Sequence, residues 1–225
     1  MGMVLGKIDV ECAKFDTIPL PSDSSFSLRR MHPHVVACVS SNPNQEITDS
    51  DMFRLLVKYI GVFGTPQNLA SSSSQNPQVV AMTALVLSSS SSSTPTPTAI
   101  AMTAPVLNLN LNDANMDANT NADARQMSFV LPAIFTSIQS APTPTDPRVL
   151  LKEVLSHTIA VKSFSGSVDM ATAAPIAEEF KSYLTNNHGF TCKEWRLARY
   201  NPPFTLPFLR TNEIWVTIDE QEKET

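Results

Sequence analysis

The side chains best suited to hold a metal are two histidines, His32 and His34, which stand two residues apart in RRMHPHVVA. The surrounding segment, Phe26 to Ser40, is rich in β-forming residues and reads as a strand, or as a strand pair bent at Pro33. Alternate residues of a strand share one face, so either imidazole could approach a metal there. An exposed strand histidine is, however, more often a plain solvated side chain than a metal ligand.

The three cysteines, at positions 12, 38 and 192, are far apart and show no CxxC spacing. This pattern argues against a thiolate zinc site or a disulfide framework and favours a reducing compartment.

Sequence motifs of catalytic chemistry are absent from the chain. It holds no GxSxG elbow, HExxH pair, phosphate-binding loop or paired-glycine dinucleotide fingerprint. Glu213 in TNEIW and Arg199 in LARY could form an ion pair or a site, but both lie in segments expected to fix strand ends, so structural roles are favoured. We therefore expect that this protein is not an enzyme.

The charge balance excludes several classes of partner. The formal net charge is −5, and the 16 lysines and arginines are scattered rather than clustered, so neither nucleic acid nor an anionic membrane is an expected partner. No stretch approaches the roughly 18 consecutive apolar residues of a membrane span, and the first residues resemble neither a signal nor a transit peptide. These features predict a cytoplasmic protein without stable membrane insertion.

Three tracts are dominated by small polar residues: about 70–77 by Ser, 88–98 by Ser, Thr and Pro, and 108–124 by Asn, Asp and Ala. Such segments bury too little apolar surface to offset the entropy of ordering them. We expect flexible low-complexity insertions within a single domain that spans residues 1–225.

Two helices are predicted. Thr48 with Asp51 resembles a capping box, apolar residues then recur at helical spacing, and Gly61 can end the turn, which predicts a helix over about 49–61. A second helix is predicted from Pro175, which suits a first turn, to Thr185, before Asn187-His188-Gly189.

Apolar β-like runs surround these helices, at 79–87, 99–107 and 126–132 in the first half, and in HTIAVKSFSG, CKEWRLARY and NEIWVTI in the second. Each half therefore reads strand, helix, strand, strand. This pattern predicts an α+β domain in which a pseudo-symmetric antiparallel sheet, shaped as a distorted β-barrel, carries two flanking helices.

Several phrases, in this order, resemble the SOUL heme-binding family: KIDVECAKF, LRRMHPHVVA, LLVKYIGVFG, IAMTAPV, MSFVLP, VKSFSG and LARYNPPFTLPFLRTNEIWV. They span about residues 7 to 218, and the start MGMVLGKI is most similar to plant cytosolic members. The resemblance implies reversible binding of heme or protoporphyrin in a shallow apolar groove beside the first helix, as a carrier or buffer of tetrapyrroles.

The same resemblance implies the residues of that groove. Phe53, Val57 and Lys58 fall on its helical wall, with Lys58 available to a propionate, and Leu206 and Phe208 fall on the loop before the last strand. Phe53 and Val57 would serve equally as ordinary core residues at this spacing. Where some relatives have a histidine ligand this chain has Arg30, which leaves His32 and His34 as the candidates for an axial iron ligand.

One phrase of the family is written twice, as AMTALVL from Ala81 and as AMTAPVL from Ala101. Only one copy can occupy one position in the sheet, and the second is expected there because it keeps Pro105 and lies closer to MSFVLP.

An alternative function stays open at this point. The groove could accept an apolar peptide or a partner helix, which would make the protein an interaction module with the polar tracts as tethers.

Overall fold

The computed structural model describes residues 8, 10–20, 25–41, 47–62, 64–70, 97–110, 125–201 and 204–219. Its helices are α1 (Asp49–Ile60) and α2 (Met170–His188). The principal strands are β2 (Phe15–Ile18), β3 (Ser27–Met31), β4 (His34–Ser40), β7 (Val106–Asn110), β8 (Arg125–Val130), β10 (Leu150–Val154), β11 (His157–Phe164), β12 (Thr191–Arg199) and β13 (Asn212–Asp219). Short elements are β1 (Glu11–Cys12), β5 (Asn68–Leu69), β6 (Thr103–Ala104), β9 (Thr143–Pro144) and the 3-10 helices η2 (Ile138–Ser140) and η3 (Pro207–Leu209).

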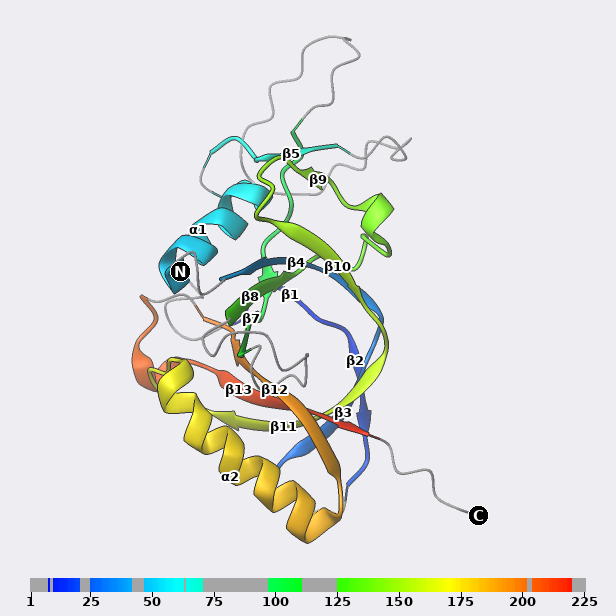
Figure 1. Ribbon diagram of the computed structural model, residues 1–225, viewed down its shortest axis with the longest axis vertical. Coiled ribbons are helices and arrows are strands. Elements are labelled where there is room, and N and C mark those ends of the chain that lie inside the picture. The colour runs from blue at the N-terminus through cyan, green and yellow to red at the C-terminus, as the bar shows by residue number, and fades with distance from the viewer. Residues whose placement is uncertain are drawn as a thin grey trace.

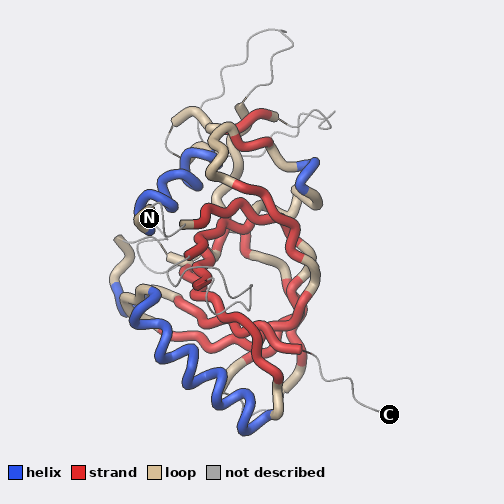
Figure 2. Tube along the Cα trace, in the orientation of Figure 1, coloured by secondary structure: helices blue, strands red, loops and turns tan. Residues whose placement is uncertain are grey.

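The principal strands form one antiparallel sheet in the order β10-β4-β8-β7-β12-β13-β11-β3-β2. Figure 2 shows this sheet curling into an incomplete ring, with both helices on its outside. This arrangement confirms the predicted class, an α+β distorted barrel with two flanking helices.

The two halves of the sheet repeat one plan. In the first half β4, α1, β7 and β8 follow one another along the chain, and in the second half β11, α2, β12 and β13 do the same. The strands lie in the order β4-β8-β7 in one half and β11-β13-β12 in the other, and the halves join where β7 pairs with β12. A pseudo-twofold relation therefore runs through the β7–β12 pair, and each half carries its own helix (Figure 1).

Helix α1 begins and ends where its local sequence predicts. The Thr48 side chain accepts a hydrogen bond from the Asp51 amide, its hydroxyl donates to the Asp51 carboxylate at 2.7 Å, and Gly61 ends the helix at φ 83°. Met52, Leu56 and Tyr59, at helical spacing, are fully buried against β4 and β8. The left-handed conformation at Gly61 suits a residue without a side chain.

Helix α2 begins earlier than the predicted start at Pro175. Asp169 caps it, since its carboxylate accepts from the Thr172 amide at 2.8 Å, and the helix runs on from Met170. Pro175 thus lies more than a turn inside, where its missing N–H removes one helical hydrogen bond. The good helix formers of the Ala-rich first turns and the cap outweigh that loss. Gly189 of the predicted stop signal does end the helix, at φ 70°, but the helix continues through His188, past the predicted last residue Thr185.

Strand alternation decides which side chains face the helices. On β12, Trp195 and Leu197 pack against α2 in one core cluster, while Ala198 belongs to a separate cluster on the inner face of the ring. Since alternate residues share a face, Arg199 projects to the helix side as Leu197 does. This alternation places the Arg199 side chain on the outer face of the ring.

The second copy of the doubled phrase enters the sheet, as predicted. Thr103–Ala104 form β6, and Val106 and Leu107 begin β7, pairing with β8 on one side and β12 on the other. The copy from Ala81, the predicted insertion at 70–77 beyond Ala70, and 88–96 of the next insertion lie outside the described residues.

The third predicted insertion is wrong over its first three residues. Residues 108–110 belong to β7, where Asn108 is buried and accepts a hydrogen bond from Arg199 at 2.8 Å. Pairing on both strand edges therefore overrides the polar composition there. The remainder, 111–124, is outside the described residues.

Candidate functional site

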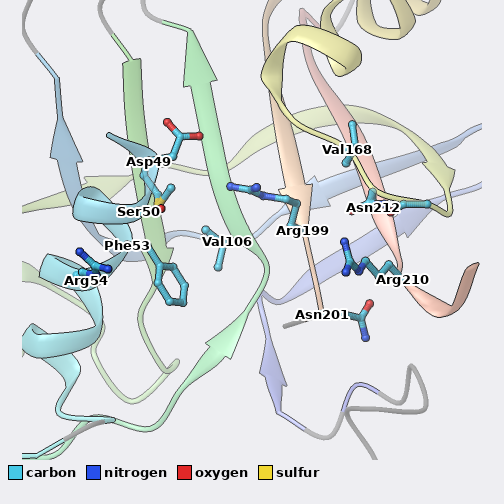
Figure 3. Close-up of a pocket in the computed structure, with 12 residues that line it drawn as sticks. Asp49, Ser50, Phe53, Arg54, Val106, Val168, Arg199, Asn201, Arg210 and Asn212 are labelled. Carbon is cyan, nitrogen blue, oxygen red and sulfur yellow. Dashed lines mark hydrogen bonds between the residues drawn. The ribbon is translucent and has the colours of Figure 1, made fainter. Parts of the chain in front are cut away.

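A cavity of about 560 Å³ lies on the helix side of the sheet, where the two halves meet. The first half lines it with Asp49, Ser50, Phe53, Arg54, Val106 and Met127, and the second half with Gly166, Val168, Arg199, Asn201, Arg210 and Asn212. Figure 3 shows α1 on one side and the residues of β12, β13 and the 166–168 loop on the other. Neither half could form this cavity alone.

The wall from the first half is largely apolar. Phe53 is half-buried on α1, and its ring points toward the cavity while its edge packs on Phe129 with centroids 5.6 Å apart. Val106 of β7 and Met127 of β8 continue the wall. A flat aromatic or apolar ligand can stack on such a surface.

Arg199 dominates the opposite wall. Its side chain extends from β12 across the cavity toward α1 (Figure 3), and its Nη2 donates to the Asn108 side-chain oxygen at 2.8 Å. Burial lowers the pKa of the guanidinium, and the charges of Asp49 and Asp169 only partly oppose this effect. The cavity therefore holds a partly desolvated positive charge.

The remaining polar groups fix the rim. Arg210 donates from Nε to the Thr205 carbonyl at 2.8 Å and from Nη1 to the Ser167 hydroxyl at 3.0 Å. The Asn212 side chain donates to the Gly166 carbonyl at 3.0 Å. These bonds tie the loop before β13 to the loop before α2, so the rim is held from two directions.

The predicted groove residues lie at different depths. Phe53 lines the cavity, whereas Val57, 4% exposed, belongs to the core cluster against which Phe53 packs. Lys58 is exposed one turn beyond Arg54. Leu206 and Phe208, which are 47% and 70% exposed, lie at η3 beside the cavity residues but do not line it.

The two histidines proposed as iron ligands lie at the bend between β3 and β4, and neither lines the cavity. The His32 Nε2 lies 3.0 Å from the Asp16 carboxylate, and the His34 Nδ1 donates to the His32 carbonyl at 2.7 Å. Burial lowers the pKa of His34, with the hydrogen bond to His32 opposing it. Within the described part of the chain, no three His, Cys, Asp or Glu side chains group as they do around a metal ion.

Sequence reasoning missed the chemical role open to Arg199 and did not single out Arg210. It favoured a structural strand-end role for Arg199 and left open an ion pair with Glu213. The structure does not form that pair, because Glu213 faces the inside of the ring, where Arg29 binds it. The signal available in the sequence is strand alternation. Arg199 stands two residues after the apolar Leu197 and therefore shares its face of β12.

Comparison with known protein families identifies the family of this chain. The sequence profile described as "SOUL heme-binding protein" matches residues 10–217. The chain belongs to the SOUL heme-binding protein family. A search of the curated proteins finds no match. Among the described residues, the SOUL chain has no helix long and apolar enough to cross a membrane.

Solved structures give more distant likenesses to this SOUL chain. The C-terminal domain of EcmrR superposes with a TM-score of 0.47 at 9% identity, over 92% of this chain and 98% of that one. An uncharacterized conserved protein from Listeria innocua gives 0.45 at 8% identity, over 93% and 94%. SAV2435 bound to tetraphenylphosphonium gives 0.43 at 11% identity, over 88% and 96%.

Proposed function

We propose that this protein binds heme and metal-free porphyrins reversibly in the cavity between α1 and the loops of the second half, as a carrier or buffer of tetrapyrroles. The observation that carries the proposal is the pairing of an apolar wall at Phe53 with a cationic wall at Arg199 in a cavity of about 560 Å³. That volume falls within the roughly 300–1,000 Å³ of small-molecule sites.

The energetics suit reversible binding without a bond to iron. Burying about 400 Å² of flat apolar macrocycle at roughly 25 cal/mol per Å² gives on the order of 10 kcal/mol. Association costs roughly 4–15 kcal/mol of such a total. A porphyrin held in this way exchanges readily, and hemin and protoporphyrin bind with similar affinity.

In this proposal the ring lies against Phe53, with Val57 supporting the helix from the core. Leu206 and Phe208 cover the outer edge of the ring from η3, which explains why such large apolar side chains are left exposed. Lys58, on the same face of α1 as Arg54, is the cation available to a propionate at the rim.

The proposal is tested by titrating hemin and protoporphyrin IX into the purified protein. We expect a saturable Soret change with hemin and saturable fluorescence quenching with protoporphyrin, with dissociation constants within about tenfold of each other, a difference of about 1.4 kcal/mol. Absence of both signals up to tens of micromolar would refute tetrapyrrole binding.

The exposed trio Phe204, Leu206 and Phe208 also favours a second candidate function, an interaction module that takes an apolar peptide or partner helix. Competition separates the two functions. If the protein is an interaction module that does not bind porphyrin, an apolar peptide stays bound in excess porphyrin. If one groove takes both ligands, porphyrin displaces the peptide.

A further inference from the structure

Within the described part of the chain, the Arg199 side chain at the cavity wall donates a hydrogen bond only to a neutral amide, that of Asn108. Among the described residues it forms no ion pair with a carboxylate. The two acidic groups that influence it are engaged elsewhere. Asp49 pairs with Arg125 at 2.9 Å, and Asp169 caps α2 through the Thr172 amide.

A partly desolvated guanidinium without a direct ion pair is less favourable than one in water, and an anion that pairs with it offsets that cost. Arginine has five donors in a planar fork, of which Arg199 directs one to Asn108. The remaining donors are suited to a bidentate carboxylate. The cavity volume and the apolar wall at Phe53 leave room for that carboxylate to be carried by a flat ring.

We infer that Arg199 is the specificity-determining residue of the cavity, and that it admits planar apolar ligands by the carboxylate they carry inward. The inference rests on the proposed function and deepens it: the substrate class becomes ring systems with a free carboxylate, and the neutral esters of the same rings are rejected. One carboxylate of the ligand is then buried against β12, the other remains available to Lys58, and the apolar edge of the ring faces η3.

The test compares protoporphyrin IX with its dimethyl ester, which keeps the ring and removes both charges. Wild-type protein is expected to bind the free acid at least tenfold more tightly than the ester. Arg199→Gln is expected to lower affinity for the free acid to that of the ester and to leave the ester unchanged. Arg199→Lys, which keeps the charge but loses the fork, is expected to retain part of the preference.

Arg148→Gln is the matched control, because it removes an exposed arginine that pairs with Asp146 away from the cavity. It is expected to keep the full preference. Thermal unfolding of each variant without ligand checks the fold. If Arg199→Gln does not fold, Arg199→Lys still tests the residue, because an undiminished acid preference in that variant would show that the arginine fork is not used.

Each outcome bears on a different statement. Equal binding of acid and ester by wild-type protein overturns the role of Arg199 while tetrapyrrole binding stands. A preference that survives Arg199→Gln, or one that Arg148→Gln also abolishes, overturns it as well. Binding of neither probe overturns both the inference and the proposed function.

Discussion

Arg29 and Glu213 form a bidentate ion pair on the inner face of the sheet, with Nη1 3.0 Å from Oε2 and Nη2 2.9 Å from Oε1. The carboxylate also accepts from the Tyr200 hydroxyl at 2.6 Å, the Trp215 indole at 2.7 Å and the Ser163 hydroxyl at 3.1 Å. The side chain of Glu213 is only 6% exposed. This network therefore ties β3 to β13, the last strand of the sheet in chain order.

Removing the cation of this pair is expected to destabilise the fold strongly. Arg29→Met leaves a buried carboxylate without its counter-charge and should lower the free energy of unfolding by about 3–5 kcal/mol. Urea denaturation measures the change. Arg30→Met, at the exposed neighbouring position, is the control and should cost less than about 1 kcal/mol; equal effects of the two variants would contradict the structural role of the pair.

Glu213 should also contribute to the pH dependence of stability. Burial alone would raise its pKa, but the hydrogen bonds from Arg29, Tyr200 and Trp215 outweigh it and hold the pKa below the ordinary 4.5. The unfolded chain therefore takes up this proton at a higher pH than the folded protein does. The stabilisation is present above about pH 4.5 and is lost as pH falls through the folded pKa.

Urea midpoints measured from about pH 7 down to pH 3 test this expectation. Wild-type protein should lose stability more steeply below pH 4.5 than Glu213→Gln, which cannot titrate at this position. Parallel curves for the two proteins would show that other carboxylates carry the acid dependence.

Phe53 and Val57 separate ligand contact from core packing on one helix. Phe53→Ala should weaken protoporphyrin binding about tenfold, because it removes a ring from the cavity wall. Val57→Asp should unfold the protein, because it places a charge in the core. Tyr183→Ala on α2 is the aromatic control, because Tyr183 is 36% exposed and does not line the cavity. It should leave porphyrin binding unchanged; a comparable loss there would mean that Phe53 acts only through stability.

The histidine pair can be tested by removing both rings. The double variant His32→Ala, His34→Ala should leave the Soret maximum and the hemin affinity of the protein unchanged. The His32 ring bonds to the Asp16 carboxylate, the His34 ring bonds to the His32 carbonyl, and neither ring lines the cavity. Hemin titration followed by absorbance is the measurement. A shifted Soret band in the double variant would restore an axial histidine.

Asn68 is fully buried, and its side chain connects three backbone groups. Its Nδ2 donates to the carbonyls of Tyr59 at 2.7 Å and Thr98 at 2.8 Å, and its Oδ1 accepts from the Thr98 amide at 2.8 Å. Asn68→Ala leaves these groups without partners and should cost about 2–4 kcal/mol. Thermal unfolding measures the change. Gln67→Ala is the control and should be nearly neutral, because Gln67 makes its hydrogen bonds through its backbone.

The local elements of this fold could be predicted from the sequence because their signals are local. The cap at Thr48, the stop at Gly61 and the bend at Pro33 each depend on a few neighbouring residues, and each lies where the pattern predicts. The predicted start of α2 at Pro175 is wrong, because the helix begins after the cap at Asp169 and continues through the proline.

The site could be predicted only in part, because it depends on strand pairing. Phe53 was recognisable from the resemblance and from helical spacing. The position of Arg199 on the cavity wall requires that β12 pair with β7 in the observed register, with Arg199 opposite Val106. Likewise, nothing near Glu213 in the sequence indicates that Arg29, 184 positions away, is its partner.

The cavity lies where the two halves of the sheet join, at the β7–β12 pair. A ligand bound there would contact both halves of the sheet at once. Because it binds only while the two halves are joined, its binding should raise the resistance of the whole molecule to heat and to protease, including parts far from the cavity.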